Sequence, residues 1–431
     1  MYLGLDFGTS GARACAIADD LSVRWEQRFA YANPAAQTPE DWRTALLHLL
    51  GALPPNIAQH LQGIAVDAMS ATVLLCDEQL IPVSPALLYN DARAQAEAER
   101  LRQMADDAAV VGSATSGLAK FLWLTAQSGE EQAQYFMHQA DWLTALLSGH
   151  PGITDYHNAL KTGYDVAALR WPAWILALPH AHLLPEVRTP GSIVSTIQPA
   201  LAARFGIAPT CRIHAGTTDS TAAFIASGIS EIGVGLTSLG TTLVLKQLAE
   251  QRIEAPEYGI YSHRMGERWL VGGASNAGAG VLKQFFDDAQ LAELSRRIDP
   301  ATDSPLDYYP LPNRGERFPH ADPQLLPRLT PRPADDAEFL HGLLQGLSRI
   351  EVAGYARLSE LGAPALQRVV STGGGAQNPV WRQLRQRLLG VPVDSAEHSE
   401  AAYGSARLAM DNHLFSAPDG ARSRATPQPI G

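Results

Sequence analysis

The first residues of the chain combine an apolar strand with a carboxylate and a glycine–hydroxyl turn. Residues 3–10 read LGLDFGTS, so a short strand delivers Asp6 into a turn that contains Gly8 and Thr9. Glycine permits the close approach at which main-chain N–H groups converge on phosphate oxygens. A carboxylate that ends a buried strand is costly unless it is paired or bound to a cation, and its oxygens suit Mg²⁺. The alternative is an Asp6 side chain that caps its own turn.

A second turn of the same kind occurs in the other half of the chain. Residues 235–242 read GLTSLGTT, again with glycine and hydroxyl side chains between two apolar segments. Two phosphate-type turns, one in each half, predict a duplicated fold that closes on a nucleotide. The repeat concerns the order of elements, because the two segments share little sequence.

A second candidate carboxylate is Asp219, in the segment AGTTDST at residues 215–221. It lies at the start of a predicted helix, where an aspartate is commonly an N-cap. The other interpretation is a general base that takes a proton from a substrate hydroxyl as this attacks the γ-phosphate of a nucleotide. An ordinary carboxylate is ionised at neutral pH, so both interpretations stay open on spacing alone.

A third segment, residues 373–381, reads GGGAQNPVW and follows a predicted strand. Successive glycines let the backbone approach a flat ligand, with Asn378 and Trp381 available for polar and stacking contacts. The alternative is a tight strand-to-helix turn with a tryptophan in the core.

Composition and missing motifs exclude several classes of protein. The formal net charge is -11, which argues against a nucleic-acid or anionic-membrane surface. No Walker A motif, dinucleotide-binding GxGxxG, HExxH or GxSxG occurs in the chain. Isolated Cys15, Cys76 and Cys211, without metal-type spacing, indicate reduced thiols and a cytoplasmic protein. Neither a signal peptide nor a membrane-spanning run is apparent.

The periodicity predicts an α/β chain with a boundary near residue 210, which divides it into residues 1–210 and 211–431. Strands are expected at 2–5, 13–17, 23–29, 63–68 and 73–76, and a helix capped by Thr38 at 42–50. We expect Asp91 to cap a helix that runs to about Met104, and residues 120–149 to be helical with Asp141 as a cap. Residues 299–335 are predicted to be a long loop, functional or mobile, and 420–431 a frayed tail.

Taken together, the motifs resemble the FGGY carbohydrate kinases. They occur in the family's order from about residue 2 to 410: LGLDFGTSG, then residues 88–93, 216–220, 238–241, 315–317 and 373–381. The resemblance implies two actin-like (ribonuclease-H-like) domains with an interdomain cleft. The first domain would hold mostly the sugar and the second mostly ATP.

The resemblance also implies roles for particular residues. Asp6 would be the carboxylate on the phosphate and Mg²⁺ side, Thr9 the phosphate-turn hydroxyl, and Asp219 the catalytic base. Gly240 and Thr241 would form the second phosphate turn, and Gly374, Asn378 and Trp381 the adenosine pocket. The implied cofactors are ATP and Mg²⁺, and the chain is expected to be a monomer or homodimer.

The identity of the sugar depends on two segments. Xylulokinases of this family usually carry a Met–His pair after the fourth strand, whereas here Ser70 follows Met69. This segment and residues 154–161 look more like the D-ribulose kinases, in which Ser70 would hydrogen-bond the sugar alongside Asp6 and Asp219. D-ribulose is therefore the expected substrate, with D-xylulose or another pentose or polyol as alternatives. An inert actin-like sugar sensor is the alternative of a different class, which retention of Asp6 and Asp219 disfavours.

Overall fold

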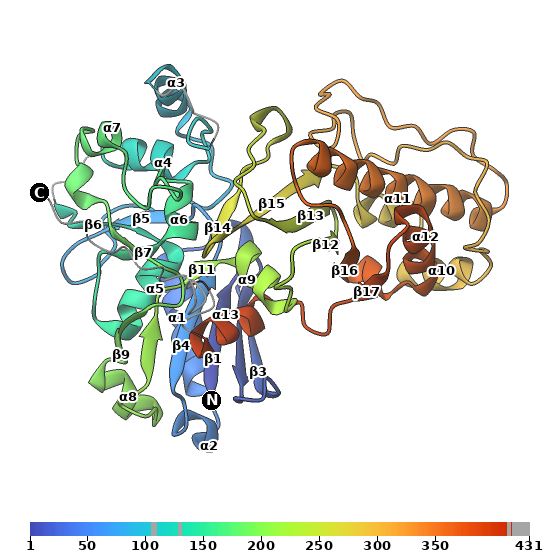
Figure 1. The fold of residues 1–431 in the computed structure, drawn as a ribbon. Coiled ribbons are helices and arrows are strands. Elements are labelled where there is room, and N and C mark those ends of the chain that lie inside the picture. Colours follow the sequence, from blue (N-terminus) through green and yellow to red (C-terminus); the bar gives the residue numbers. More distant parts are fainter. Residues whose placement is uncertain (105–109, 128–131, 412–414, 416–431) are drawn as a thin grey trace, which may run out of the picture.

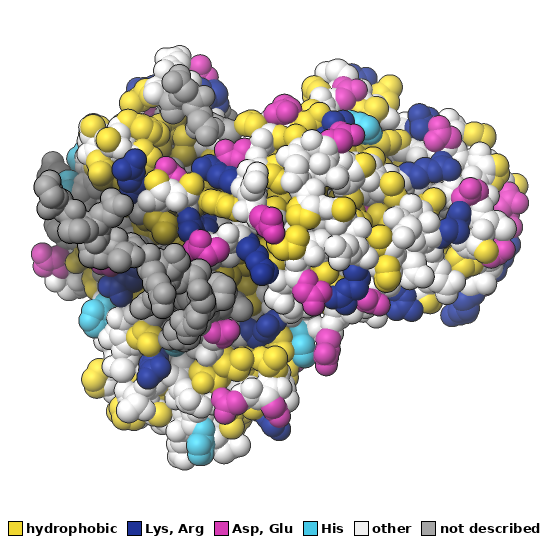
Figure 2. All heavy atoms as spheres, viewed as in Figure 1, with side chains coloured by type: hydrophobic (Ala, Val, Ile, Leu, Met, Phe, Trp, Pro, Cys, Tyr) yellow, Lys and Arg dark blue, Asp and Glu magenta, His cyan; other side chains and the backbone are white. Residues whose placement is uncertain are grey.

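The protein consists of two lobes, each built on one β-sheet (Figure 1). The structure is a computed structural model that describes residues 1–104, 110–127, 132–411 and 415. The tail predicted at 420–431 lies outside the described residues. On the face shown in Figure 2, acidic and basic side chains are interspersed over both lobes.

The first sheet has the strand order β3-β2-β1-β4-β10-β9, with the short β11 beside β4. Strands β1, β2 and β3 form an antiparallel meander, and β4 and β10 run parallel to β1. The bounds are β1 Tyr2–Phe7, β2 Gly11–Ile17, β3 Val23–Ala30, β4 Gly63–Ala68, β9 Ile193–Thr196, β10 Arg212–His214 and β11 Thr217–Thr218.

The second sheet repeats this plan. Its order is β14-β15-β13-β12-β16-β17, in which β12, β13 and β15 are antiparallel and β16 and β17 run parallel to β12. The bounds are β12 Val234–Leu239, β13 Leu243–Ala249, β14 His263–Met265, β15 Arg268–Ser275, β16 Arg368–Thr372 and β17 Val393–Ser395. The duplicated architecture expected from the two glycine turns is confirmed.

Helices cover the two large sheets, and the first lobe also contains small two-stranded sheets. These elements are α1 Pro39–Gly51, α2 Pro55–Ala58, β5 Val73–Cys76, α3 Gln95–Met104, α4 Gly117–Leu124, β6 Tyr135–His138, α5 Gln139–Ser148, β7 Ile153–Asp155, α6 Tyr156–Leu160, α7 Ala173–Leu176, β8 Glu186–Arg188, α8 Pro199–Phe205, α9 Asp219–Ala226, α10 Asp288–Ser295, α11 Asp336–Glu360, α12 Pro379–Leu389 and α13 Ala401–Met410. Within the described residues, not even the 25-residue α11 has a stretch apolar enough to cross a bilayer.

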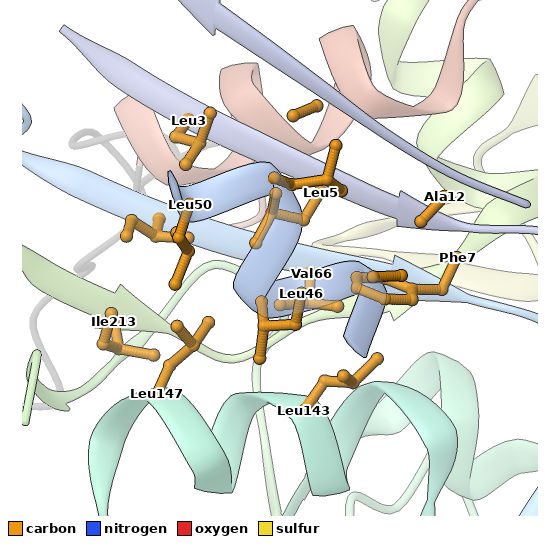
Figure 3. Packing of buried hydrophobic residues seen from close by; sticks show 14 of the residues in the cluster. Leu3, Leu5, Phe7, Ala12, Leu46, Leu50, Val66, Leu143, Leu147 and Ile213 are labelled. Carbon is orange, nitrogen blue, oxygen red and sulfur yellow. The ribbon is translucent and has the colours of Figure 1, made fainter. Parts of the chain in front are cut away.

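Alternation along β1 separates the core of the first lobe from its site. Leu3 and Leu5 are fully buried and pack with Leu46 of α1 and Leu143 of α5 (Figure 3). Because successive side chains of a strand point to opposite faces, Gly4 and Asp6 share the other face. The core that holds β1 in place therefore leaves Asp6 on the side of α9 and α13.

The C-terminal helix α13 returns to the first lobe and packs on β1 (Figure 1). Glycine is required where they touch, because a Cβ on Gly4 would lie 1.8 Å from the carbonyl oxygen of Ala402. A Cβ on Gly404 of α13 would lie 1.9 Å from the Ala222 carbonyl oxygen of α9. Strand β10, helix α9 and helix α13 thus pack with the first sheet, although they follow residue 210. The division at residue 210 stays a prediction.

Two local predictions differ from the structure. Helix α3 begins only at Gln95, because the Asp91 carboxylate instead accepts hydrogen bonds from the backbone and side chain of Arg93. The segment 120–149 contains the strand β6, whose four residues are too few for periodicity to distinguish from helix. Asp141 is the third residue of α5, and its carboxylate accepts the backbone N–H of His138, the N-cap residue.

The long loop at 299–335 contains neither an α-helix nor a β-strand, as predicted. It is fastened to the second sheet by the buried Glu316, whose carboxylate accepts hydrogen bonds from Ser275 Oγ (2.6 Å) and Asn276 N (2.7 Å). Glu316 therefore attaches the loop beside the end of β15. Ion pairs also attach the loop to α12 and α11, and these join Asp303 to Arg387 and Asp307 to Arg349.

Candidate active site

The carboxyl edge of the first sheet brings three aspartates together. Asp6 of β1 and Asp67 of β4 are register partners in a parallel pair. Thr217 of β11 pairs with Asp67, and Asp219 follows two residues later as the first residue of α9. Strand register therefore pairs Asp6 with Asp67, and the turn from β11 into α9 adds Asp219, although the three residues are far apart in the sequence.

Asp6 lies in an unusual electrostatic environment. Burial raises the pKa of its carboxyl to about 6, and the nearby negative charge of Asp219 acts in the same direction, whereas Arg13 opposes it. Asp67 is fully buried, which raises its pKa, and its Oδ2 accepts a hydrogen bond from Ser405 Oγ of α13 (2.6 Å). In the described part of the chain, no backbone N–H of the following turn donates to Asp6, so the self-capping alternative is not seen.

Asp219 is not the N-cap of α9. That position belongs to Thr218, which makes no side-chain cap hydrogen bond. The Asp219 carboxylate accepts the N–H of the adjacent Ser220 at 2.6 Å. Burial raises the pKa of Asp219, while this hydrogen bond and the charges of Lys246 and Lys161 lower it. The carboxylate thus lies beside two cations and is free for an interaction other than capping.

A small cavity of about 270 Å³ lies between these carboxylates and the first glycine turn. Its lining includes Asp6, Thr9, Asp219 and the ion pair of Arg13 with Glu400. No group of three metal-ligating side chains occurs among the described residues. Two of the carboxylates in this lining, those of Asp6 and Asp219, are hard oxygen donors. Proteins commonly bind Mg²⁺ through one or two such carboxylates together with phosphate oxygens and water.

A larger cavity of about 630 Å³ opens in the second lobe. It is lined by the β12–β13 turn, by α10 and by the glycine segment after β16. It includes five of the six residues assigned to the nucleotide, namely Gly240, Thr241, Gly374, Asn378 and Trp381, whereas the sixth, Thr9, lines the small cavity. The structure thus brings the five residues to one pocket, whose volume suits a mononucleotide-sized ligand.

Asn378 and Trp381 build the wall of this larger cavity. Asn378 Oδ1 caps α12 by accepting the N–H groups of Val380 and Trp381, and its Nδ2 donates to Ser295 Oγ (2.8 Å). Trp381 is only 1% exposed and donates from Nε1 to Ser348 Oγ (3.1 Å). The tryptophan is therefore mainly a core residue, and only part of it lines the cavity.

Ser70 lies two residues beyond β4, at the same sheet edge as Asp67. Its Oγ is buried and has no hydrogen-bond partner in the described part of the protein. The next residue, Ala71, has a φ of 59°, a left-handed conformation that is uncommon for a residue with a side chain. A buried hydroxyl without a partner is suited to a ligand's hydroxyl group.

The turn at Ser70 is held by a buried lysine. Lys120 of α4 has no exposed surface, and its Nζ donates to the carbonyl oxygens of Ala71 (2.8 Å) and Leu88 (2.7 Å). Burial lowers the pKa of Lys120 to about 7, although Asp91 opposes this shift. Lys120 therefore ties the segment after β4 to the segment at 88–93.

The lowered pKa of Lys120 makes stability depend on pH. Between about pH 7 and the ordinary lysine value near 10.5, the unfolded chain binds a proton that the folded protein lacks. Stability therefore rises with pH across this window, by at most about 1.4 kcal/mol per unit, and is lost as pH falls to 7. We expect Lys120→Met to lack this slope. Urea unfolding at pH 7, 8 and 9 measures it, and parallel curves for the two proteins would contradict the assignment.

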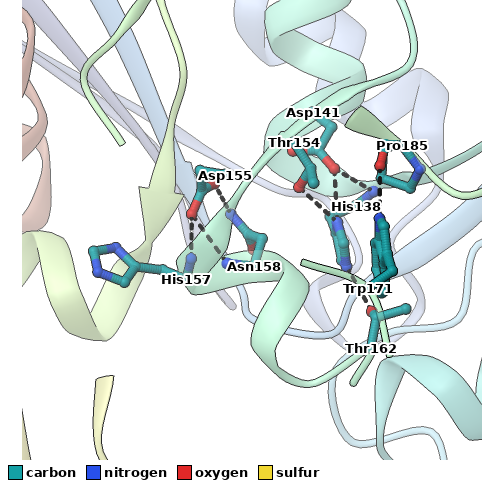
Figure 4. A network of polar contacts seen from close by, with 9 residues as sticks. All are labelled: His138, Asp141, Thr154, Asp155, His157, Asn158, Thr162, Trp171 and Pro185. Carbon is teal, nitrogen blue, oxygen red and sulfur yellow. Dashed lines mark hydrogen bonds and ion pairs between the residues drawn. The ribbon is translucent and has the colours of Figure 1, made fainter. Parts of the chain in front are cut away.

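Helix α6 is fixed by a network of polar contacts (Figure 4). Buried Asp155 accepts the backbone N–H groups of His157 (2.8 Å) and Asn158 (3.0 Å) and the side-chain amide of Asn158 (2.6 Å). His157 accepts from or donates to Thr217 Oγ1 (2.7 Å) and donates from Nε2 to the Arg264 carbonyl of the second lobe (2.6 Å). The segment 154–161 therefore contacts both the Asp219 turn and the second lobe.

Sequence reasoning missed several charged residues of the site. Lys246, Lys120, Arg13 and Glu400 had no assigned role, although each lies in or beside the groups described above. One feature of the sequence could have drawn attention to the lysines among them. Lysine occurs only at positions 120, 161, 246 and 283, and all other residues with a permanent positive charge are arginines. Lys283 lines the larger cavity, and Lys161 and Lys246 act on Asp219.

The geometry of two repeated lobes, paired glycine turns and a carboxylate edge has a counterpart among known protein families. The model of the FGGY family of carbohydrate kinases, N-terminal domain, matches residues 1–226, and that of the C-terminal domain matches residues 235–412. The chain belongs to the FGGY family of carbohydrate kinases. It is accordingly an ATP-dependent sugar kinase, and the predicted actin-like, ribonuclease-H-like fold is confirmed.

Individual relatives support the same family. The xylulose kinase of Escherichia coli (strain K12) is 25% identical over 441 residues, which cover 95% of this chain and 90% of that protein. The xylulose kinase of Streptomyces coelicolor is 28% identical over 390 residues (86% and 78%). The gluconokinase of Bacillus subtilis (strain 168) is 21% identical over 443 residues (93% and 85%).

Solved structures share the fold. The ligand-bound xylulose kinase from Lactobacillus acidophilus superposes with a TM-score of 0.79 at 15% identity, covering 96% of this chain and 92% of that one. The Plasmodium falciparum glycerol kinase with ADP gives a TM-score of 0.81 at 16% identity, with the same coverage. The similar folds of kinases named for different sugars mean that the fold leaves the sugar open.

Proposed function

We propose that this kinase transfers the γ-phosphoryl group of ATP to the terminal hydroxyl of a small ketose, with D-ribulose preferred over D-xylulose. The observation that carries the choice of sugar is Ser70, a buried hydroxyl without a partner at the position where xylulokinases usually have histidine. A hydroxyl both donates and accepts a hydrogen bond, as a sugar hydroxyl requires of its partner. The relatives named as xylulose kinases support D-xylulose as the second candidate.

The proposed mechanism assigns proton transfer to Asp219. Its carboxylate would accept the proton of the sugar's terminal hydroxyl as that oxygen attacks the γ-phosphorus. Phosphoryl transfer of this kind depends chiefly on positioning and on charge stabilisation. The turns at Thr9 and at Gly240 and Thr241 would hold the phosphates with backbone N–H groups, while Gly374, Asn378 and Trp381 would enclose the adenosine.

Asp6 is proposed to hold Mg²⁺ at the small cavity. Asp6 would hold the cation, whose positive charge would supply neutralisation of the phosphates during phosphoryl transfer. Burial and the neighbouring Asp219 disfavour the charged form of Asp6, and both effects are offset when a cation is near. The cytoplasmic location and the monomeric or homodimeric state expected from the sequence stay predictions.

A sugar panel tests the choice of substrate. ADP release by the purified protein with Mg-ATP is measured against D-ribulose, D-xylulose, L-ribulose, ribitol, glycerol and gluconate. We expect the highest kcat/KM for D-ribulose, at least about tenfold above D-xylulose, which corresponds to about 1.4 kcal/mol of transition-state binding. A higher value for D-xylulose would overturn the preference. No sugar exceeding the rate without sugar would overturn the proposed reaction.

A further inference from the structure

Lys246 lies on the second sheet but contacts the first lobe beside the proposed base. Strand β13 carries it, and its Nζ donates to the carbonyl oxygen and to Oγ of Ser220 (2.6 Å to Oγ). Ser220 is the second residue of α9, and its N–H donates to Asp219 Oδ1 at 2.6 Å. Lys246 of the second sheet and the Asp219 carboxylate therefore both bind Ser220, at different groups of that residue.

Asp219 is the acidic group that stabilises the charge of Lys246. Burial lowers the pKa of Lys246 to about 8, and the negative charge of Asp219 opposes this shift. Lys161 also opposes the rise that burial causes in the pKa of Asp219. Burial lowers the pKa of His157 and of His263, and the charge of Lys246 acts in the same direction. Lysine concentrates its charge on three rotatable donors at the end of a flexible stem, whereas arginine presents a planar fork. The chain has lysine at only four positions, and one of them extends from the second lobe to the residue next to Asp219. A compact ammonium charge suits this position.

We propose that Lys246 is a positioning residue for phosphoryl transfer, which acts through Ser220 on the carboxylate of Asp219. The Ser220 N–H holds one oxygen of Asp219 within the start of α9, and the Lys246 ammonium holds Ser220 from the second sheet. The position of the base thereby depends on the packing of the nucleotide-side sheet against the first lobe. This inference rests on the proposed role of Asp219, and it adds a coupling between the two lobes.

The test compares Lys246→Met with Arg264→Met. Arg264 also reaches from the second sheet to the first lobe, where its Nη1 donates to the carbonyl oxygens of Val166 (3.1 Å) and Ala167 (3.2 Å), but these residues do not contact Ser220. Steady-state kinetics use whichever panel sugar the wild-type protein phosphorylates best. We expect Lys246→Met to lower kcat at least about tenfold with the KM for ATP and for sugar within threefold, and Lys246→Arg to recover part of kcat.

The outcomes separate this inference from the proposed function. A kcat of Lys246→Met within twofold of wild type, or equal losses in Lys246→Met and Arg264→Met, would overturn the positioning role. Ser220→Ala gives a second readout if Lys246→Met is poorly folded, because it removes one of the two acceptors; a kcat unchanged from wild type would count against the positioning role. If Asp219→Asn is inactive while Lys246→Met is fully active, the inference fails and the proposed base is retained.

Discussion

Replacing Asp219 with asparagine is expected to lower kcat for sugar phosphorylation by about 10²–10⁴-fold, the range of general-base catalysis. The amide oxygen can still accept the Ser220 N–H that Asp219 Oδ1 accepts now, so the local geometry is preserved. The amide cannot take up the proton of the attacking hydroxyl. ATP affinity should change little, because the larger cavity is built from the second lobe. Steady-state kinetics and calorimetric titration with ATP measure the two effects.

A matched control addresses the alternative that an aspartate at a helix start only stabilises the helix. Asp335 precedes α11, where its side chain accepts the Ala337 N–H, and it lies outside the residues that line the two cavities. Asp335→Asn should therefore keep kcat near the wild-type value. Near-normal turnover in Asp219→Asn would end the assignment of the base.

Replacing Gly374 with leucine is expected to raise the KM for ATP by tenfold or more. Gly374 lines the larger cavity, and a Cβ there meets no heavy atom within 4 Å, so we expect the backbone to accept a side chain that reduces the space for the nucleotide. We take the leucine to remove about 60 Å² of the surface that the nucleotide would bury. At about 25 cal/mol per Å² of buried surface, this loss lowers the affinity for ATP about tenfold. The KM for sugar should be unchanged. Kinetics with varied ATP, together with the thermal midpoint, measure the result.

The choice of position matters for this experiment. A Cβ at the neighbouring Gly375 would lie 2.5 Å from Trp381 Cζ3, so a substitution there would disturb the core instead of the cavity. Arg382→Leu adds a leucine at an exposed position of α12 that does not line the cavity, and it should leave the KM for ATP unchanged. An unchanged KM in Gly374→Leu would place the nucleotide elsewhere.

The parts of the fold that local sequence determines were predictable. The strand before Asp6, the hairpin around Gly240 and the helix start at Thr38 each depend on residues only a few positions apart, and all three are present. The strand β6 was missed because a segment of four residues is too short to show a distinguishing period. The return of α13 to β1 depends on glycine contacts between the two ends of the chain, for which a local pattern offers no sign.

The same distinction applies to the candidate site. The edge shared by Asp6 and Asp219 follows from strand order. The glycine turns and the resemblance predicted a duplicated, actin-like fold but no strand order. The contacts of Lys246 with Ser220 and of His157 with the Arg264 carbonyl join the two lobes, so they depend on how the lobes pack. The sequence left two interpretations of Trp381, a stacking contact with a ligand or a residue of the core. Its burial and its hydrogen bond to Ser348 make it mainly a core residue. The catalytic and binding roles of these residues stay predictions.

The most direct test of the proposed reaction is to identify where the phosphoryl group goes. The protein is incubated with Mg-ATP and D-ribulose labelled with ¹³C at carbon 5, and the products are observed by ³¹P NMR. We expect ADP and an equal amount of a phosphomonoester whose phosphorus couples to carbon 5. Inorganic phosphate as the only partner of ADP, or a phosphoryl group on carbon 1, would contradict transfer to the carbon-5 hydroxyl of the ketose.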